Sequence, residues 1–168
     1  MDFDLHPSVS LRPRSFNALV ASNEMFAKAL NCNLKLQCFK VLYICGNYSS
    51  ILSKLDRKFT DLEIRRAFTI FQLMTILEEA RHSLIIIEHD PTIYEDAAEM
   101  VEYISRYLSD AAREATVLLY SPGSAPFLED LTRNADRVFY LDERPRATAS
   151  SSLRVKPSVR MRVGCKNS

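Results

Sequence analysis

The chain has 168 residues, of which 47% are hydrophobic and 26% charged, and its formal net charge is +1. This length and composition fit one compact domain with enough apolar residues to form a core. No stretch approaches the roughly 18 consecutive apolar residues of a membrane-spanning helix, and the acidic start MDFDLHPS is unlike a signal peptide. We therefore expect a cytoplasmic protein with no membrane partner.

Short apolar runs rich in β-forming residues alternate with helical patterns along the chain. Five of these runs predict strands, at residues 16–21, 40–47, 83–88, 116–120 and 137–141. Helices are predicted at residues 24–30, 60–80 and 95–114, followed by a short helix that Ser124 caps and that ends near Arg133. This order predicts the α/β class, with a doubly covered, mainly parallel sheet and right-handed crossovers.

The predicted helix at residues 60–80 has the clearest start signal. Thr60 and Glu63 have the spacing of a capping box, and Phe59 and Ile64 have that of a hydrophobic staple. Its apolar residues cover most of the circumference and indicate core packing; they are Ile64, Ala67, Phe68, Ile70, Phe71, Leu73, Met74, Ile76 and Leu77. Replacing Phe71 by alanine is therefore expected to cost about 3–5 kcal/mol.

The C-terminal segment differs from the rest of the chain in charge. Residues 144–168 carry seven basic and no acidic side chains, so the net charge is +7 there and −6 over residues 1–143. Apolar and basic residues alternate around Pro157, which predicts an antiparallel hairpin with one basic face. We therefore divide the chain into a core with a short N-terminal arm, residues 1–143, and a basic loop and hairpin, residues 144–168.

Clustered basic residues of this kind commonly contact the phosphates of nucleic acid. The candidate nucleic-acid-binding residues are Arg144, Arg146, Arg154, Lys156, Arg160 and Arg162. The alternatives are a solubilising tail and a segment that folds back on the acidic core.

Three polar residues follow the apolar strand at 83–88 without a turn: Glu88, His89 and Asp90. Because the carboxyl ends of parallel strands frame the ligand crevice of α/β sheets, carboxylates placed there can bind a metal or a nucleotide. Glu88 and Asp90 are thus candidate Mg²⁺ ligands and catalytic residues. Asn47, after the preceding strand, could orient a water molecule but is no general base. The alternative is structural, with Asp90 capping the helix that begins at Pro91.

The loop that would hold phosphates is missing. The chain has three glycines and no G-x-x-x-x-G-K-[ST] motif. The loop between the predicted strand at 16–21 and the helix at 24–30, Ser22–Asn23–Glu24, has no glycine and carries a carboxylate that would repel phosphate. A Ser-His-Asp site using Ser121 or Ser124 lacks the G-x-S-x-G elbow that would support it. We therefore favour a protein without a cofactor and without enzymatic activity, and leave Mg²⁺ and ATP to the alternative of an ATPase subunit.

The order of these segments resembles the RecA, RadA and KaiC branch of the P-loop ATPases. FNALVASNEMFAKAL corresponds to the first strand and helix, LIIIEHDP to the Walker B strand, and TVLLYSPGS and ADRVFYLDE to later strands before a basic hairpin. The resemblance implies a RecA-like fold in a divergent RadA-like paralogue that lacks the Walker A motif. It also places Glu88 at the position of the Walker B aspartate. Arg160 and Arg162 match positions that reach the nucleotide of a neighbouring subunit in some members.

Three functions remain open at this point. The first is a non-catalytic RecA/RadA-like protein that binds single- or double-stranded DNA, or a recombinase partner, in DNA recombination or repair, with self-association as a further alternative. The second is a magnesium-dependent ATPase subunit that binds ATP by completing its site with a neighbouring subunit. The third is a structural adaptor whose basic tail binds an acidic protein.

Overall fold

The structure is a computed structural model that describes residues 2–56, 61–142 and 162–163. Its central sheet has the strand order β5–β4–β6–β7–β3–β8–β9, in which β3 to β8 run parallel and β9 pairs antiparallel with β8. The strands are β3 (Phe16–Val20), β4 (Val41–Cys45), β5 (Leu62–Arg66), β6 (Leu84–Glu88), β7 (Thr116–Ser121), β8 (Arg137–Tyr140) and β9 (Arg162–Val163). The predicted α/β class with a mainly parallel sheet is confirmed, and the arrangement is of the kind found in RecA-like and Rossmann-like folds.

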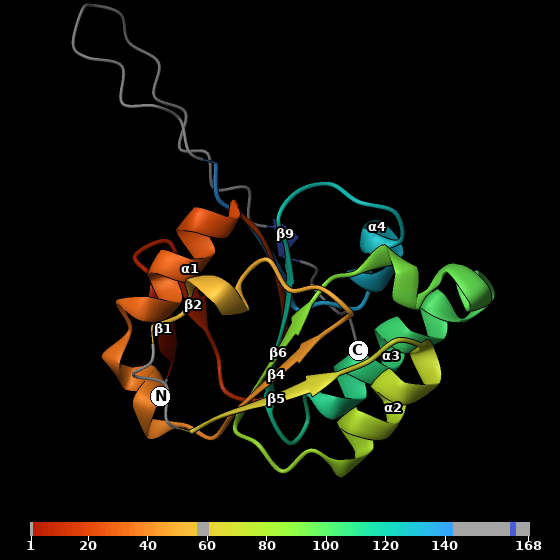
Figure 1. Cartoon of the computed structure of the whole chain (residues 1–168), viewed down its shortest axis with the longest axis horizontal. Helices are drawn as coiled ribbons and strands as arrows, with labels where there is room; N and C mark the ends of the chain where they lie inside the picture. Colours follow the sequence, from red (N-terminus) through yellow and green to blue (C-terminus); the bar gives the residue numbers. More distant parts are fainter. Residues whose placement is uncertain (1, 57–60, 143–161, 164–168) are drawn as a thin grey trace, which may run out of the picture.

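Helices cover both faces of this sheet (Figure 1). One face packs against α1 (Asn23–Asn31) and a hairpin of β1 (Phe3–His6) and β2 (Val9–Leu11). The other packs against α2 (Ile70–Glu79), α3 (Val101–Ala111) and α4 (Leu128–Leu131). Alternate residues of a strand therefore enter different cores, which is why the central strands are apolar throughout.

The chain leaves the sheet in opposite directions after β3 and β7. β3 leads into α1 on one face, whereas β7 leads towards α4 on the other, and these two strands are neighbours in the sheet. Such a switch point is where the carboxyl ends of strands open into a ligand crevice in α/β folds. The loops after β3, β4, β6 and β7 are therefore the candidate functional region.

The predicted helix at residues 60–80 is wrong in its first half. Glu63 and Ile64 belong to strand β5, which pairs with β4, and helix α2 begins at Ile70, where the Thr69 side chain accepts a hydrogen bond from the Gln72 N–H. Phe59 and Thr60 lie outside the described residues. The local capping pattern was outweighed by pairing of this segment with an exposed edge of the sheet, because tertiary hydrogen bonding overrides a weak local preference.

The expected apolar stripe of this helix is only partly buried. Ile70, Leu73, Ile76 and Leu77 lie in the core, but Ile64, Phe68 and Phe71 are 47%, 51% and 62% exposed. The expectation that Phe71 is a core residue is therefore wrong. Three aromatic and aliphatic side chains instead lie on the surface near β5 and the start of α2.

The predicted helix at residues 95–114 is divided in two. A 3-10 segment, η4 (Glu95–Met100), contains a non-helical residue, Ala97, and α3 follows it. Helix α4 begins at Leu128, after Phe127 in a left-handed conformation with φ 67°, so Ser124 does not cap it. The helix predicted at residues 24–30 is confirmed as α1, with Ser22 accepting a hydrogen bond from the Met25 N–H.

Both ends of the domain add strands. The residues expected to form a short N-terminal arm contain the hairpin β1–β2, whose buried residues are Phe3, Leu5, Val9 and Leu11. Of the predicted C-terminal hairpin, only β9 is described, and it continues the sheet beside β8 in the expected antiparallel sense. The rest of that hairpin lies outside the described residues.

Candidate functional site

The carboxyl end of β6 is occupied by the side chain of Glu88, which is 6% exposed. Its Oε2 accepts hydrogen bonds from the Tyr43 hydroxyl at 2.7 Å and the Ser49 hydroxyl at 2.5 Å. Its Oε1 accepts from the backbone N–H and the hydroxyl of Ser50, each at 3.0 Å. Four donors therefore take up the acceptor positions of this carboxylate. All four hydrogen-bond donors to Glu88 come from β4 and the loop that follows it.

A second set of contacts extends this network to the loop after β3. Asn23 Oδ1 lies 2.8 Å from the Tyr120 hydroxyl and 3.2 Å from the Ser50 hydroxyl. The Tyr120 hydroxyl is also 2.9 Å from the carbonyl oxygen of Ala21, to which it donates. Side chains from the ends of β4, β6, β7 and the start of α1 thus form one continuous polar network across the switch point.

The Tyr120 ring fills the space beneath the loop at Ser22. It is fully buried and stacks on Phe26 of α1, with ring centroids 3.9 Å apart. Burial raises the pKa of the Tyr120 hydroxyl above its usual range, and the nearby Glu88 carboxylate adds to the shift. Tyr120 thus links the end of β7 to the start of α1 through its hydroxyl and its ring.

Asp90 performs the structural role that the sequence left as an alternative. Its Oδ1 accepts hydrogen bonds from the backbone N–H of Thr92 at 3.0 Å and from the Thr92 hydroxyl at 2.7 Å, and thereby caps the short helix η3 (Pro91–Ile93). A Cβ at Gly46 would clash with its other oxygen, so a side chain there would have to displace Asp90. Glu88 and Asp90 therefore bind different partners.

Asn47 lies in the exposed loop after β4. The guanidinium of Arg66 donates to the carbonyl oxygens of Gly46 and Asn47 at 2.9 and 3.0 Å, so the loop is held from the neighbouring strand β5. The next residue, Tyr48, is 86% exposed, whereas Ser49 and Ser50 turn back towards Glu88. The loop thus turns its two serines towards Glu88 and presents its tyrosine to solvent.

His89 is buried beside this network. Its Nε2 lies 2.9 Å from the carbonyl oxygen of Pro126, its ring stacks on Tyr94, and its backbone N–H donates to the Tyr120 carbonyl. Within the described part of the chain, neither His89 Nδ1 nor the Tyr94 hydroxyl has a hydrogen-bond partner. Burial lowers the pKa of His89 and raises that of Tyr94.

Ser121, the other candidate for a Ser-His-Asp site, donates a hydrogen bond to the carbonyl oxygen of Gly123.

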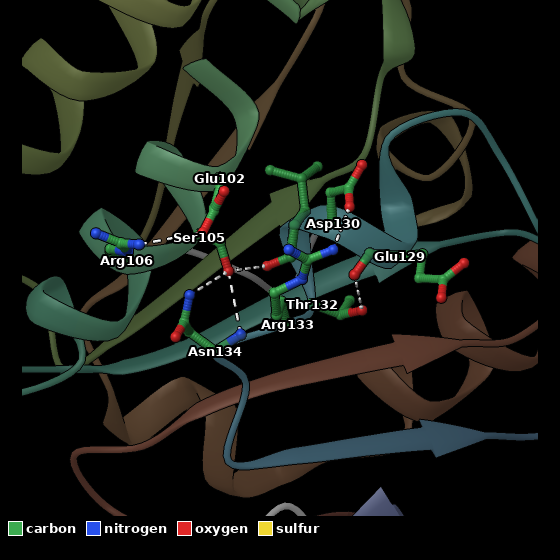
Figure 2. Close-up of polar contacts among 9 residues, drawn as sticks. Glu102, Ser105, Arg106, Glu129, Asp130, Thr132, Arg133 and Asn134 are labelled. Atoms are coloured by element: carbon green, nitrogen blue, oxygen red, sulfur yellow. Dashed lines mark hydrogen bonds and ion pairs between the residues drawn. The ribbon is translucent and has the colours of Figure 1, made fainter. Parts of the chain in front are cut away.

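Ser105 secures the loop that carries Pro126 by fixing α4 to α3. Its buried hydroxyl donates to the carbonyl oxygen of Leu131 at 2.8 Å and accepts from the backbone and side-chain nitrogens of Asn134, each at 3.1 Å (Figure 2). The charged residues around it pair at the surface, Arg106 with Glu102 and Arg133 with Asp130. Such exposed pairs contribute little stability, so α4 is positioned by the Ser105 hydrogen bonds together with the buried side chains of Leu128 and Leu131.

The candidate nucleic-acid-binding residues are mostly outside the described part of the chain. Arg144, Arg146, Arg154, Lys156 and Arg160 all lie there, and Arg162 is described only by its backbone pairing with Val138. Their role therefore stays a prediction. Within residues 2–56, 61–142 and 162–163, no three His, Cys, Asp or Glu side chains gather in a way that could hold a metal ion. No helix in the same ranges combines the length and the apolar character that crossing a bilayer requires.

The sequence matches no known protein family profile. An uncharacterised protein of the archaeon Archaeoglobus fulgidus is 34% identical to it over 128 residues. The matched region covers 76% of this chain and 65% of the archaeal protein, so the chain spans less than two thirds of that relative's length. The resemblance to RecA and RadA stays a prediction.

The residues that bind Glu88 were missed by sequence reasoning. Tyr43 lies in the middle of a buried apolar strand, where a tyrosine hydroxyl needs a hydrogen-bond partner. Ser49 and Ser50 follow the same strand after a short loop. A tyrosine within a buried strand and a serine pair shortly after that strand, next to a strand that ends in a carboxylate, are the signal that could have indicated this cluster.

Proposed function

We propose that this protein is a non-catalytic RecA-like protein that acts in DNA recombination or repair by binding DNA or a RecA/RadA-type recombinase. The closure of the crevice at the switch point supports the non-catalytic part. Tyr120, Asn23, Ser50 and Glu88 lie at the switch point, where α/β folds commonly bind ligands, and they are hydrogen-bonded to one another. A domain of this fold without an open crevice is suited to act through its surface.

The distribution of charge supports the binding part. The basic segment 144–168 carries +7 and the remaining chain −6, so a polyanion would be attracted to the C-terminal side of the molecule. Backbone pairing of β9 with β8 ties part of this segment to the folded sheet. Binding to phosphates would follow shape and charge more than base sequence, since no described helix has the features of a base-reading element.

Calorimetry with ATP and Mg²⁺ on the whole chain tests the non-catalytic part. We expect no heat of binding, because the loop before α1 has no glycine and carries Glu24, which is paired with Lys54 at 3.3 Å. Micromolar affinity would overturn it. Such a result would favour the ATPase subunit that completes its site with a neighbour, with Glu88 and Asp90 as its metal ligands.

Salt-dependent binding of fluorescent single- and double-stranded DNA tests the binding part. Substitution of Arg144, Arg146, Arg154 and Lys156 by glutamine leaves β9 intact. It should lower affinity and reduce the slope of log K against log salt by about 0.7–0.9 for each phosphate that is no longer bound. The matched control replaces four exposed basic residues elsewhere: Lys28, Lys35, Arg106 and Arg113. Equal weakening in both variants, or no DNA binding by the native chain, would contradict DNA binding through the tail; in the second case a protein partner becomes the favoured hypothesis.

A further inference from the structure

Strand β5 forms one edge of the central sheet. It pairs with β4 on its inner side, and among the described residues no strand pairs with its outer side. The middle residue, Ile64, is 47% exposed. An open edge with an exposed aliphatic residue offers unpaired N–H and C=O groups to another strand.

The direction of these backbone groups follows from a contact at the end of the strand. The N–H of Ala67 donates to the carbonyl oxygen of Cys45 in β4, at 2.9 Å. Because N–H and C=O groups alternate between the two sides of a strand, Glu63 and Arg65 also direct theirs towards β4. The groups of Leu62, Ile64 and Arg66 therefore point outwards.

The same strand is complementary to a second copy of itself. In an antiparallel pair related by a twofold axis at Ile64, the two Ile64 residues exchange both backbone hydrogen bonds, and Leu62 of each copy lies opposite Arg66 of the other. Glu63 then lies opposite Arg65 of the second copy, twice over. Directly opposite residues on one face are about 4.5–5.5 Å apart at Cβ, which is within reach of an ion pair.

Side-chain contacts hold these two charges in suitable positions. Glu63 lies 3.0 Å from His82, and Arg65 lies 3.0 Å from Glu79 of α2, so both are held on the α2 face of the sheet. Their side chains remain 51% and 39% exposed. Pairing about a twofold axis at Ile64 would place each Glu63 carboxylate beside the Arg65 guanidinium of the other copy. A pairing centred on either charged residue would instead place like charges opposite each other.

We propose that this protein forms a homodimer by antiparallel pairing of β5 with β5 of a second copy, centred on Ile64. The two sheets then continue into one another, with the α2 helices of both copies on the same face. The proposal does not depend on DNA or recombinase binding. An interface of five residues a side buries less surface than the roughly 1,200–2,000 Å² of stable complexes. The dimer should therefore dissociate on dilution.

A charge-exchange experiment tests this geometry. Sedimentation velocity of the whole chain at increasing concentration should show a monomer–dimer equilibrium. Glu63→Arg and Arg65→Glu should each weaken self-association at least about tenfold, because like charges then face each other. An equimolar mixture of these two variants should recover dimers, since positions 63 and 65 are then both arginine in one copy and both glutamate in the other. Arg113→Glu, at an exposed position of the distant α3 end, is the control for charge reversal.

Circular dichroism confirms folding of each variant, and Ile64→Lys provides a second test that leaves Glu63 and Arg65 unchanged. It should also give monomers, because two lysines would meet at the axis. A native chain that sediments as a monomer at every concentration would overturn the proposal. A dimer that none of these substitutions weakens, or a mixture that associates no more than its components, would do the same.

Discussion

Tyr43 and Glu88 lie on the adjacent strands β4 and β6, and the buried Tyr43 hydroxyl donates a hydrogen bond of 2.7 Å to Oε2 of Glu88. The bond joins the middle of one strand to the end of the next. Burial and the neighbouring carboxylate together raise the pKa of this tyrosine far above its usual range. The hydroxyl is therefore protonated at neutral pH and can donate this bond.

Removal of this donor should destabilise the protein. Tyr43→Phe leaves the packing of the ring intact but deprives the carboxylate of one of its four donors, and we expect a loss of about 1–3 kcal/mol in the free energy of unfolding. Tyr48→Phe is the matched control, because Tyr48 is 86% exposed and its change should stay within about 0.5 kcal/mol. Urea unfolding of both variants measures the difference, and equal effects would argue against a structural role of the Glu88 cluster.

Gly46 should tolerate no side chain in the native structure. A Cβ at this position would lie 2.9 Å from Cγ of Asp90 and closer still to Oδ2, so Gly46→Ala must displace the cap of η3. The expected loss is about 1–3 kcal/mol. Gly123→Ala is the control, since no atom lies within 4 Å of its Cβ position.

A second substitution identifies the cause of the Gly46 effect. Asp90→Ser keeps a capping oxygen with a shorter side chain, and Gly46→Ala should cost much less in that background. The four free energies of unfolding form a double-mutant cycle. Additive effects would show that Asp90 is not what excludes the methyl group.

His89 should make stability depend on pH. Burial lowers its pKa in the folded state, so between that pKa and the ordinary value of about 6.5 the unfolded chain binds more protons. Stability should therefore fall as pH falls below about 6.5. His89→Gln should flatten this part of the profile, measured by urea unfolding at a series of pH values. An unchanged slope in His89→Gln would be incompatible with a buried neutral imidazole.

Alanine substitutions in helix α2 should destabilise the protein on its buried side and have little effect on its exposed side. Leu73→Ala removes a fully buried side chain and should cost about 2–5 kcal/mol. Phe71→Ala, at a position 62% exposed, should stay within about 0.5 kcal/mol. Thermal unfolding distinguishes the two, and a large effect of Phe71→Ala would mean that another surface covers this residue in solution.

Sequence patterns predicted the parallel core well and its edges poorly. A strand buried on both faces is apolar along its length, as at residues 84–87 of β6, so such a run is recognisable in the sequence. LEIRR of β5, in contrast, has the mixed composition of a solvated segment, and its capping-box spacing favoured a helix. The β5 segment is a strand because it pairs with the free edge of β4. This pairing joins residues that are apart in the chain, so a local sequence pattern does not reveal it.

In the candidate site, too, the sequence predicted some features and the tertiary structure decided others. From the amino-acid sequence alone it follows that the chain has no phosphate-binding glycine loop and that Glu88 and Asp90 end a central strand, since both depend only on residue type and local order. The tertiary structure decided what those carboxylates bind. Tyr43, Ser49 and Ser50 reach Glu88 because β4 lies beside β6, and Tyr120 reaches Asn23 because β7 lies beside β3. The order of the strands in the sheet brings these residues together. This order depends on pairing between distant segments, so no local sequence pattern predicts it.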